Sequence, residues 1–109
     1  GHGRKNQIEG ILPKNSQVVL IEDLISTGKS SMEAIKALQE NHATVKCLLS
    51  IFDYNFQVAE KRFKKEGISV YSLSDYEHLI ALATENRFIL KSEEEMLRKW
   101  RLAPEKWKP

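Results

Sequence analysis

Two acidic residues stand directly before a short turn rich in hydroxyl groups. Glu22 and Asp23 follow the apolar run 18–21, and the turn that comes next, 26–31, has the sequence Ser-Thr-Gly-Lys-Ser-Ser. A turn that opens a helix presents unpaired backbone N–H groups and the positive end of the helix dipole, and Gly28 allows the backbone to approach a ligand closely. Carboxylates repel a phosphate but accept hydrogen bonds from ribose hydroxyls, and a nearby Mg²⁺ ion would reverse the local charge. The combination therefore indicates a site for a sugar phosphate with a metal ion.

Two simpler interpretations compete with this one. The run Gly28-Lys29-Ser30 looks like the end of a Walker A loop, but the first glycine of that motif would stand where this chain has Asp23. We therefore reject a Walker A loop. A solvated strand end and an ordinary helix cap would explain the acids and the hydroxyls separately. Their direct succession after four apolar residues favours the functional interpretation.

Three short apolar runs predict the strands that position this segment. They lie at 18–21, 44–52 and 68–73 and contain many β-branched residues. The run 44–52 is apolar enough for a strand that is covered on both faces, which is typical of parallel sheets.

Four helices are expected between and after these strands. Apolar residues at helical spacing predict a helix of about three turns between Gly28 and Asn41, and a second helix that ends at Gly67. Two capping-box patterns, Ser followed by Glu three positions later, predict helices over 74–85 and 92–102. The alternation predicts an α/β fold, a three-layer, mainly parallel sheet flanked by helices, with ligands at the carboxyl ends of the strands.

The composition is that of one globular unit. The chain has 109 residues, of which 41% are hydrophobic and 29% charged, and 17 Lys and Arg against 15 Asp and Glu give a net charge of +2. This balance does not indicate binding to nucleic acid or to a membrane, and the expected location is cytoplasmic. The single cysteine, Cys47, cannot form an internal disulfide and is expected to be buried. Trp100 and Trp107 are expected to pack the C-terminal tail onto the domain.

The segment 18–31 resembles a known signature. Four apolar residues, two acids and a Thr-Gly turn are similar to the phosphoribosyl pyrophosphate (PRPP) binding motif of type I phosphoribosyltransferases, whose core sheet is Rossmann-like. Within that superfamily, His2-Gly3 and Ile8-Glu9-Gly10 resemble the end of the flexible catalytic loop of orotate phosphoribosyltransferases. A Gly-His start is also typical of a cloning remnant or a disordered end.

The resemblance implies roles for particular residues. Glu22 and Asp23 would bind the ribose 2′- and 3′-hydroxyls, Ser26 would also contact orotate, and His2 would reach the pyrophosphate, usually in the neighbouring subunit of a homodimer. No protein side chain would bind the metal directly, because Mg²⁺ is expected through the substrate and water. The catalytic residues implied are His2, Glu22 and Asp23, and the residues implied to bind PRPP are His2, Glu22, Asp23, Leu24, Ile25, Ser26, Thr27, Gly28, Lys29 and Ser30.

The match also implies what this chain lacks. The lysine expected two positions before the loop histidine would precede Gly1, and the amino-terminal part of the family fold is missing, with the pyrophosphate loop and part of the orotate pocket. Residues 1–109 are thus expected to be the C-terminal part of one domain. This part would begin within the catalytic loop, whose end is 1–10, and would be inactive alone. Some family members have an arginine after the second strand, where this chain has Asp53-Tyr54-Asn55.

The function implied by the resemblance is transfer of the phosphoribosyl group from PRPP to orotate. The products would be orotidine 5′-monophosphate and pyrophosphate, in pyrimidine biosynthesis. Two alternatives are a non-catalytic regulator that senses PRPP and a phosphoribosyltransferase that acts on another base.

Overall fold

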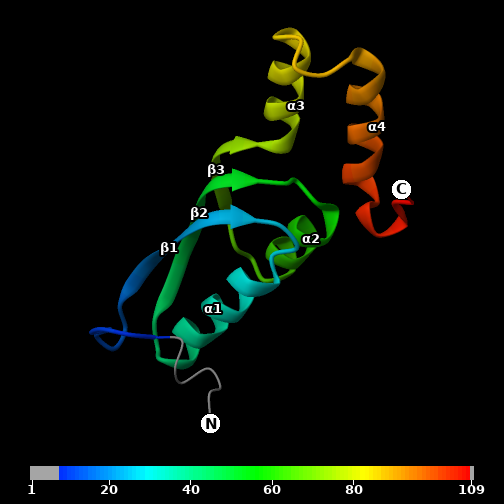
Figure 1. The fold of residues 1–109 in the computed structure, drawn as a ribbon. Helices are drawn as coiled ribbons and strands as arrows, with labels where there is room; N and C mark the ends of the chain where they lie inside the picture. Colours follow the sequence, from blue (N-terminus) through cyan, green and yellow to red (C-terminus); the bar gives the residue numbers. More distant parts are fainter. Residues whose placement is uncertain (1–7, 109) are drawn as a thin grey trace.

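A parallel sheet of three strands forms the centre of the molecule (Figure 1). The computed structural model describes residues 8–108. The strands run in the order β1-β2-β3 and occupy β1 (Gln17–Ile25), β2 (Thr44–Asp53) and β3 (Val70–Asp75). The helices are α1 (Lys29–Glu40), α2 (Gln57–Lys65), α3 (Tyr76–Glu85) and α4 (Lys91–Leu102), followed by a short 3₁₀ helix, Pro104–Lys106. The predicted parallel sheet with helical connections is confirmed.

Strand β1 is longer than its apolar run predicts. It continues through Glu22 and Asp23 to Ile25, which pairs with Asp53 of β2. The prediction that the strand ends at residue 21 is therefore wrong. Pairing with the neighbouring strand fixes the extended backbone even where the side chains are acidic, because strand formation depends more on context than on intrinsic propensity.

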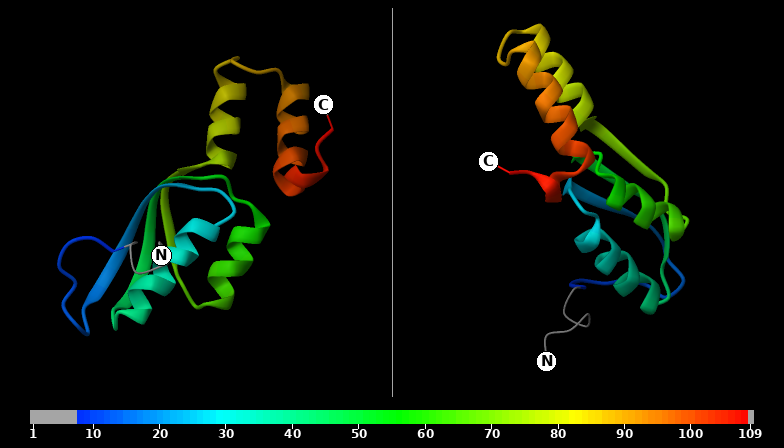
Figure 2. Two further views of the ribbon diagram at one scale, coloured as in Figure 1. Left: turned by 60° about the horizontal axis from the view of Figure 1, so that its bottom comes forward. Right: turned by 90° about the vertical axis from the view of Figure 1, so that its right-hand side faces the viewer.

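The hydrophobic core lies between the sheet and the helices α1 and α2. Figure 2 shows both helices on the same face of the sheet. Leu48 of β2 and Ile35 of α1 are fully buried, and Met32, Phe63 and Ala59 pack against them. The apolar spacing that predicted these two helices is thus the spacing of the core contacts.

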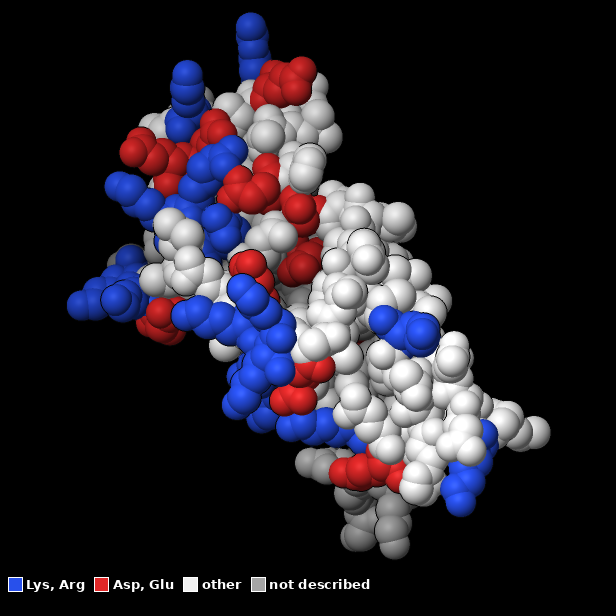
Figure 3. Space-filling view, turned by 180° about the vertical axis from the view of Figure 1, so that it is seen from behind, with Lys and Arg blue, Asp and Glu red and all other residues white. Residues whose placement is uncertain are grey.

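The opposite face of the sheet is apolar and exposed in residues 8–108. Figure 3 shows a broad area on this side of the molecule with few charged side chains. Exposed apolar side chains come from all three strands, Val19, Ile21, Leu49, Ile51, Tyr71 and Leu73. Cys47 is half-buried rather than buried. The expectation that residues 44–52 are covered on both faces is therefore not met within the described part of the chain.

Helices α3 and α4 lie side by side beyond the edge of the sheet (Figures 1 and 2). Both begin differently from the capping-box prediction. The carboxylate of Asp75, not the hydroxyl of Ser74, caps α3 by accepting from the His78 backbone N–H at 2.9 Å. Helix α4 begins at Lys91, one residue before Ser92, and the Leu90 backbone N–H donates to Glu93 at 2.8 Å. In both helices the pattern predicted the element but not its first residue.

An aromatic cluster joins α4 to the rest of the fold. The ring of Trp100 lies 5.5 Å from that of Phe56 and 5.6 Å from that of Tyr76, between centroids. The packing expected of Trp100 is confirmed, whereas Trp107 remains 49% exposed. Within residues 8–108, none of the helices combines the length and apolar character that crossing a bilayer requires.

Two leucines of the sheet test this division into a covered and an open face. We expect Leu48→Ala to lower the free energy of unfolding by about 3 kcal/mol, because it opens a cavity under α1 and α2. Leu73→Ser should change it by less than about 0.5 kcal/mol, because Leu73 is 86% exposed. Urea denaturation of both variants measures the difference, and equal losses would show that the open face is covered.

Candidate functional site

The loop between β1 and α1 forms a cleft at the carboxyl edge of the sheet. A cavity of about 350 Å³ is lined by residues 24–31 and by Glu33. Ser26, Thr27, Lys29 and Ser30 are exposed there, and Ile25 and Gly28 are buried beneath them. Residues 24–30 of the predicted PRPP-binding set are thus brought together around one cavity.

In the described part of the chain, the first turn of α1 has no side-chain cap, and its residues line this cleft. The helix begins after Gly28, and among residues 8–108 no side chain caps it. The nearest hydroxyl contact is weak, because the Lys29 N–H lies 3.4 Å from Thr27 Oγ1. The first turn of α1 also contains no acidic residue. Free N–H groups at the positive end of the helix dipole can bind an anion.

Gly28 is required by two features of its environment. Its φ angle of +80° is in the left-handed region, which residues with a Cβ atom rarely adopt. A Cβ atom here would lie 3.1 Å from the ring of Phe63 and 3.3 Å from the Cβ of Ala59, both in α2. The glycine therefore lets the loop turn sharply and lets α1 begin directly against α2.

The two acidic residues lie on opposite faces of β1. Consecutive strand residues alternate between faces, and Glu22 is half-buried whereas Asp23 is exposed. Glu22 pairs in register with Ser50, which is buried on the face that α1 and α2 cover and shares a 2.6 Å hydrogen bond with Ser72. The sequence predicts one acidic pair, whereas the structure separates the environments of the two carboxylates. His2 lies outside the described residues.

The turn after β2 lies next to the loop 26–30, the candidate phosphate-binding loop (the phosphate loop). The backbone N–H of Tyr54 donates to the carbonyl of Ile25 at 3.0 Å, so the ends of the two strands are hydrogen-bonded. Asp53 Oδ1 accepts from the Asn55 N–H at 2.8 Å. The sequence predicts no role for Asn55, because a polar residue after a strand is a weak signal for a functional site.

Two carboxyl groups near this turn have shifted pKa values in opposite directions. Burial raises the pKa of Asp53; the hydrogen bond from Asn55 lowers it, and the charges of Asp75 and Glu60 raise it further. For Asp75, partial burial raises the pKa, but hydrogen bonds from the backbone and ring of His78 outweigh burial and lower the pKa overall. Of these two carboxyl groups, only Asp53 has a pKa that is raised overall, because burial disfavours its charged form.

The described residues contain no cluster of side chains that could bind a metal ion without other ligands. In 8–108, no group of three or more His, Cys, Asp and Glu side chains lies together in a way that could hold an ion. Any cation at this edge would need ligands from a substrate or from water.

Several curated proteins similar to this chain are named orotate phosphoribosyltransferase. No family model matches the chain. A protein from Cytophaga hutchinsonii named orotate phosphoribosyltransferase is 43% identical over 107 residues, which is 98% of this chain and 51% of that protein. Its counterpart from Malacoplasma penetrans is 44% identical over 100 residues, 92% of this chain and 48% of that protein. The chain spans about half the length of the curated relatives it matches.

Solved structures with the same fold are phosphoribosyltransferases. The UMP synthase of Leishmania donovani matches 88% of this chain and 21% of that chain, with a TM-score of 0.74 and 28% identity. An orotate phosphoribosyltransferase of Mycobacterium tuberculosis, in complex with PRPP, matches 62% of this chain and 41% of that chain, with a TM-score of 0.57 and 25% identity. The fold of the described residues is therefore that of type I phosphoribosyltransferases.

Two glycine variants test the close contact between Gly28 and α2. Gly28 and Gly67 both have a positive φ angle, but nothing lies within 4 Å of a Cβ built at Gly67. Gly67→Ala should cost about 1 kcal/mol of unfolding free energy, the strain of the left-handed backbone alone. Gly28→Ala should cost a further ~1–3 kcal/mol, because its methyl group overpacks against Phe63. Equal costs, measured by urea denaturation, would show that the Phe63 ring moves aside freely.

The pKa shift of Asp53 predicts a stability difference that depends on pH. Because its folded pKa is raised, Asp53 favours the folded state below the unfolded value of 3.8, and this contribution is lost as the pH rises through the folded pKa. Asp53→Asn should therefore be more stable than the original chain at pH 7, and the gain should vanish below the unfolded pKa. Thermal unfolding of both proteins between pH 7 and a pH below 3.8 measures the difference in stability. A stability gain of Asp53→Asn that grew towards low pH would contradict the prediction.

Proposed function

We propose that this chain, a homologue of a C-terminal portion of orotate phosphoribosyltransferases, provides the PRPP-binding part of such an enzyme. The reaction would be transfer of the phosphoribosyl group from PRPP to orotate, in the cytoplasm, as a step of pyrimidine biosynthesis. The observation that carries the proposal is the uncapped start of α1 in the cleft of 24–31, directly after the acids of β1. Relatives with the same name over 92–98% of the chain support it.

The cleft offers each part of a ribose phosphate a different kind of partner. The backbone N–H groups and the hydroxyls of 26–30 suit the 5′-phosphate, because they are donors at a positive helix end. Glu22 and Asp23, which precede the residues that line the cleft, would accept hydrogen bonds from the ribose hydroxyls, and Ser26 would contact the base. Asp23 is exposed and Glu22 half-buried, so the two acids would make unequal contributions.

The chemistry proposed needs no nucleophile from this chain. A ring nitrogen of orotate would attack C1 of the ribose, and the C1–O bond to pyrophosphate would break with its electrons leaving on the pyrophosphate. The proton of the ring nitrogen would pass to water or to the departing pyrophosphate. Positive charge grows on the ribose in the transition state, and nearby carboxylates can stabilise it. The residues of the cleft would then act mainly by holding the ribose in line with the base.

We also propose Mg²⁺ as the cofactor. The carboxylate of Glu33 lines the cleft and the acids of β1 directly precede its first lining residue, Leu24, so a bound pyrophosphate would lie near several carboxylates. An ion held through the substrate and water would neutralise the leaving pyrophosphate. His2 would contact that pyrophosphate from the neighbouring subunit of a homodimer.

The complete active site is proposed to include polypeptide beyond these residues. An exposed apolar sheet face, with Ile21, Tyr71 and Leu73 each more than half exposed, is unusual for a parallel sheet. The relatives are about twice as long as this chain. Both observations support the proposal that residues 1–109 form one part of a larger domain and are inactive alone.

Substitution of the acids tests the PRPP site. Glu22→Gln with Asp23→Asn should weaken PRPP binding in the presence of Mg²⁺ by about tenfold or more, because both acceptors for the ribose hydroxyls lose their charge. The two single variants separate the contributions of the half-buried and the exposed carboxylate. Titration calorimetry on the chain measures the affinity.

Lys14→Gln provides the control, because it changes a charge in the segment before β1, remote from the cleft. Unchanged affinity in the double variant would remove the assignment of the acids. Turnover of the complete protein with PRPP and orotate, compared with adenine, tests the base.

A further inference from the structure

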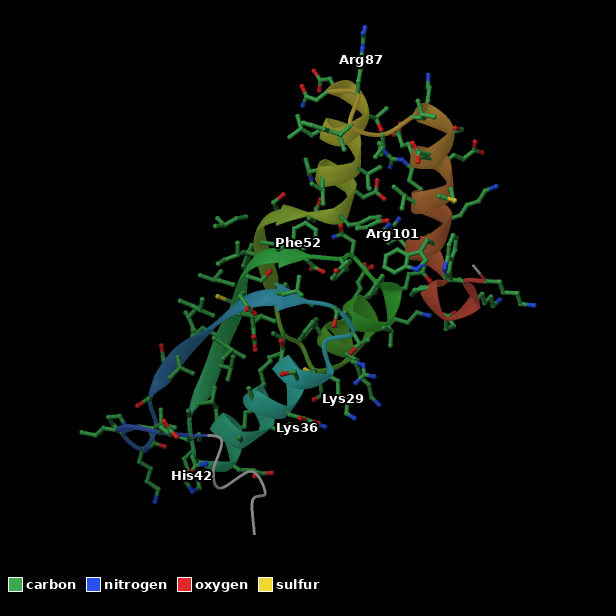
Figure 4. All side chains as sticks on the ribbon, in the orientation of Figure 1. Lys29, Lys36, His42, Phe52, Arg87 and Arg101 are labelled. Atoms are coloured by element: carbon green, nitrogen blue, oxygen red, sulfur yellow. The ribbon has the colours of Figure 1, made fainter. Side chains whose placement is uncertain are left out.

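Helix α4 is hydrogen-bonded to the turn after β2 through one guanidinium group. Arg101 donates from Nη1 to the backbone carbonyl of Asn55 at 2.9 Å and from Nε to Glu77 Oε1 at 2.9 Å. Its side chain is only 18% exposed. Figure 4 shows Arg101 reaching from α4 towards this part of the fold. The group thus connects residues far apart in the sequence at the carboxyl edge of the sheet.

Asn55 is held in an uncommon conformation by contacts on several sides. Its φ angle is +61°, in the left-handed region that few residues other than glycine adopt. Its N–H donates to Asp53, its side-chain oxygen lies 3.5 Å from the Glu77 N–H, and its carbonyl accepts from Arg101. These contacts together hold the turn in this conformation, and Arg101 supplies the charged one.

The same turn is coupled to the start of the phosphate loop. Tyr54 precedes Asn55 and donates its backbone N–H to the carbonyl of Ile25, the residue before Ser26. The Tyr54 ring stacks on Phe56 with centroids 5.2 Å apart and an interplanar angle of 9°. Ile25 itself is 1% exposed, so its position is fixed by packing as well as by this hydrogen bond. A shift of the turn would therefore move the residue from which the loop departs.

We propose that Arg101 is a positioning residue for the PRPP site. It fixes the carbonyl of Asn55 and thereby holds Tyr54 and Ile25 where Ser26 enters the cleft. The inference rests on the proposed function for its ligand, and on the hydrogen bonds above for its geometry. Arg101 does not line the cleft of 24–31, so its effect on binding is indirect.

Arg98 provides a matched control on the same helix. It also bonds to Glu77, and it pairs with Glu94 at 2.9 Å, but within residues 8–108 it makes no hydrogen bond to the turn 53–56. Its side chain is 40% exposed. Arg98→Gln and Arg101→Gln therefore each remove one charge and a Glu77 contact, and only the second removes the bond to Asn55.

Two measurements on the chain test the proposal. Arg101→Gln should weaken PRPP binding in the presence of Mg²⁺ about fivefold to tenfold, as measured by calorimetry, and Arg98→Gln should leave it within twofold of the original affinity. Arg101→Lys, which keeps a donor for Asn55, should recover part of the loss. Amide hydrogen exchange at Tyr54 and at 26–30 should be faster in Arg101→Gln than in Arg98→Gln.

Each outcome decides for or against the positioning role. Equal affinities and equal exchange rates in the two glutamine variants, at similar melting temperatures, would overturn it. Absence of PRPP binding by the original chain would count against the proposed function, and the exchange rates would then still decide whether Arg101 positions the loop. Loss of affinity in both variants in proportion to their loss of stability would also overturn it.

Discussion

The parallel pairing of β1 with β2 is the constraint on which the rest of the structure depends. It extends β1 through its acidic residues to Ile25, which pairs with Asp53, and it brings the turn after β2 beside the loop that opens α1. In a parallel sheet, successive loops emerge at the same edge, so one pairing places the hydroxyls of the loop 26–30 beside the turn after β2. The cleft is a consequence of this register rather than of any single side chain.

Packing between α1 and α2 provides the second constraint. Gly28 lies against Phe63 and Ala59, so the donors at the start of α1 are held by a contact in the core and not by a cap. A side-chain cap would have used one or two of those N–H groups internally and left fewer for a ligand. Core packing and anion binding therefore depend on the same glycine.

Sequence patterns predicted the elements well where the physics is local. The apolar spacing of Met32 and Ile35 and the apolar run around Leu48 predicted α1 and β2, because burial on one face determines both. The residues 24–30 were predicted as a group because they are contiguous. What could not be predicted depends on contacts between distant segments: the continuation of β1 through Asp23, the opposite faces of the two acids, and the bond from Arg101 to Asn55. No local pattern encodes a hydrogen bond between residues 46 positions apart.

In the function that we propose, PRPP binds at the start of α1, between the acids of β1 and the hydroxyls of the loop. The most direct measurement is an NMR titration of the isotopically labelled chain with PRPP and Mg²⁺, following each backbone amide. We expect saturable shifts concentrated at 22–31, largest at the amides of Gly28, Lys29 and Ser30, with little change in the first residues of β1 or in the last turn of α4. Shifts confined to other parts of the chain, or none at saturating PRPP, would contradict it.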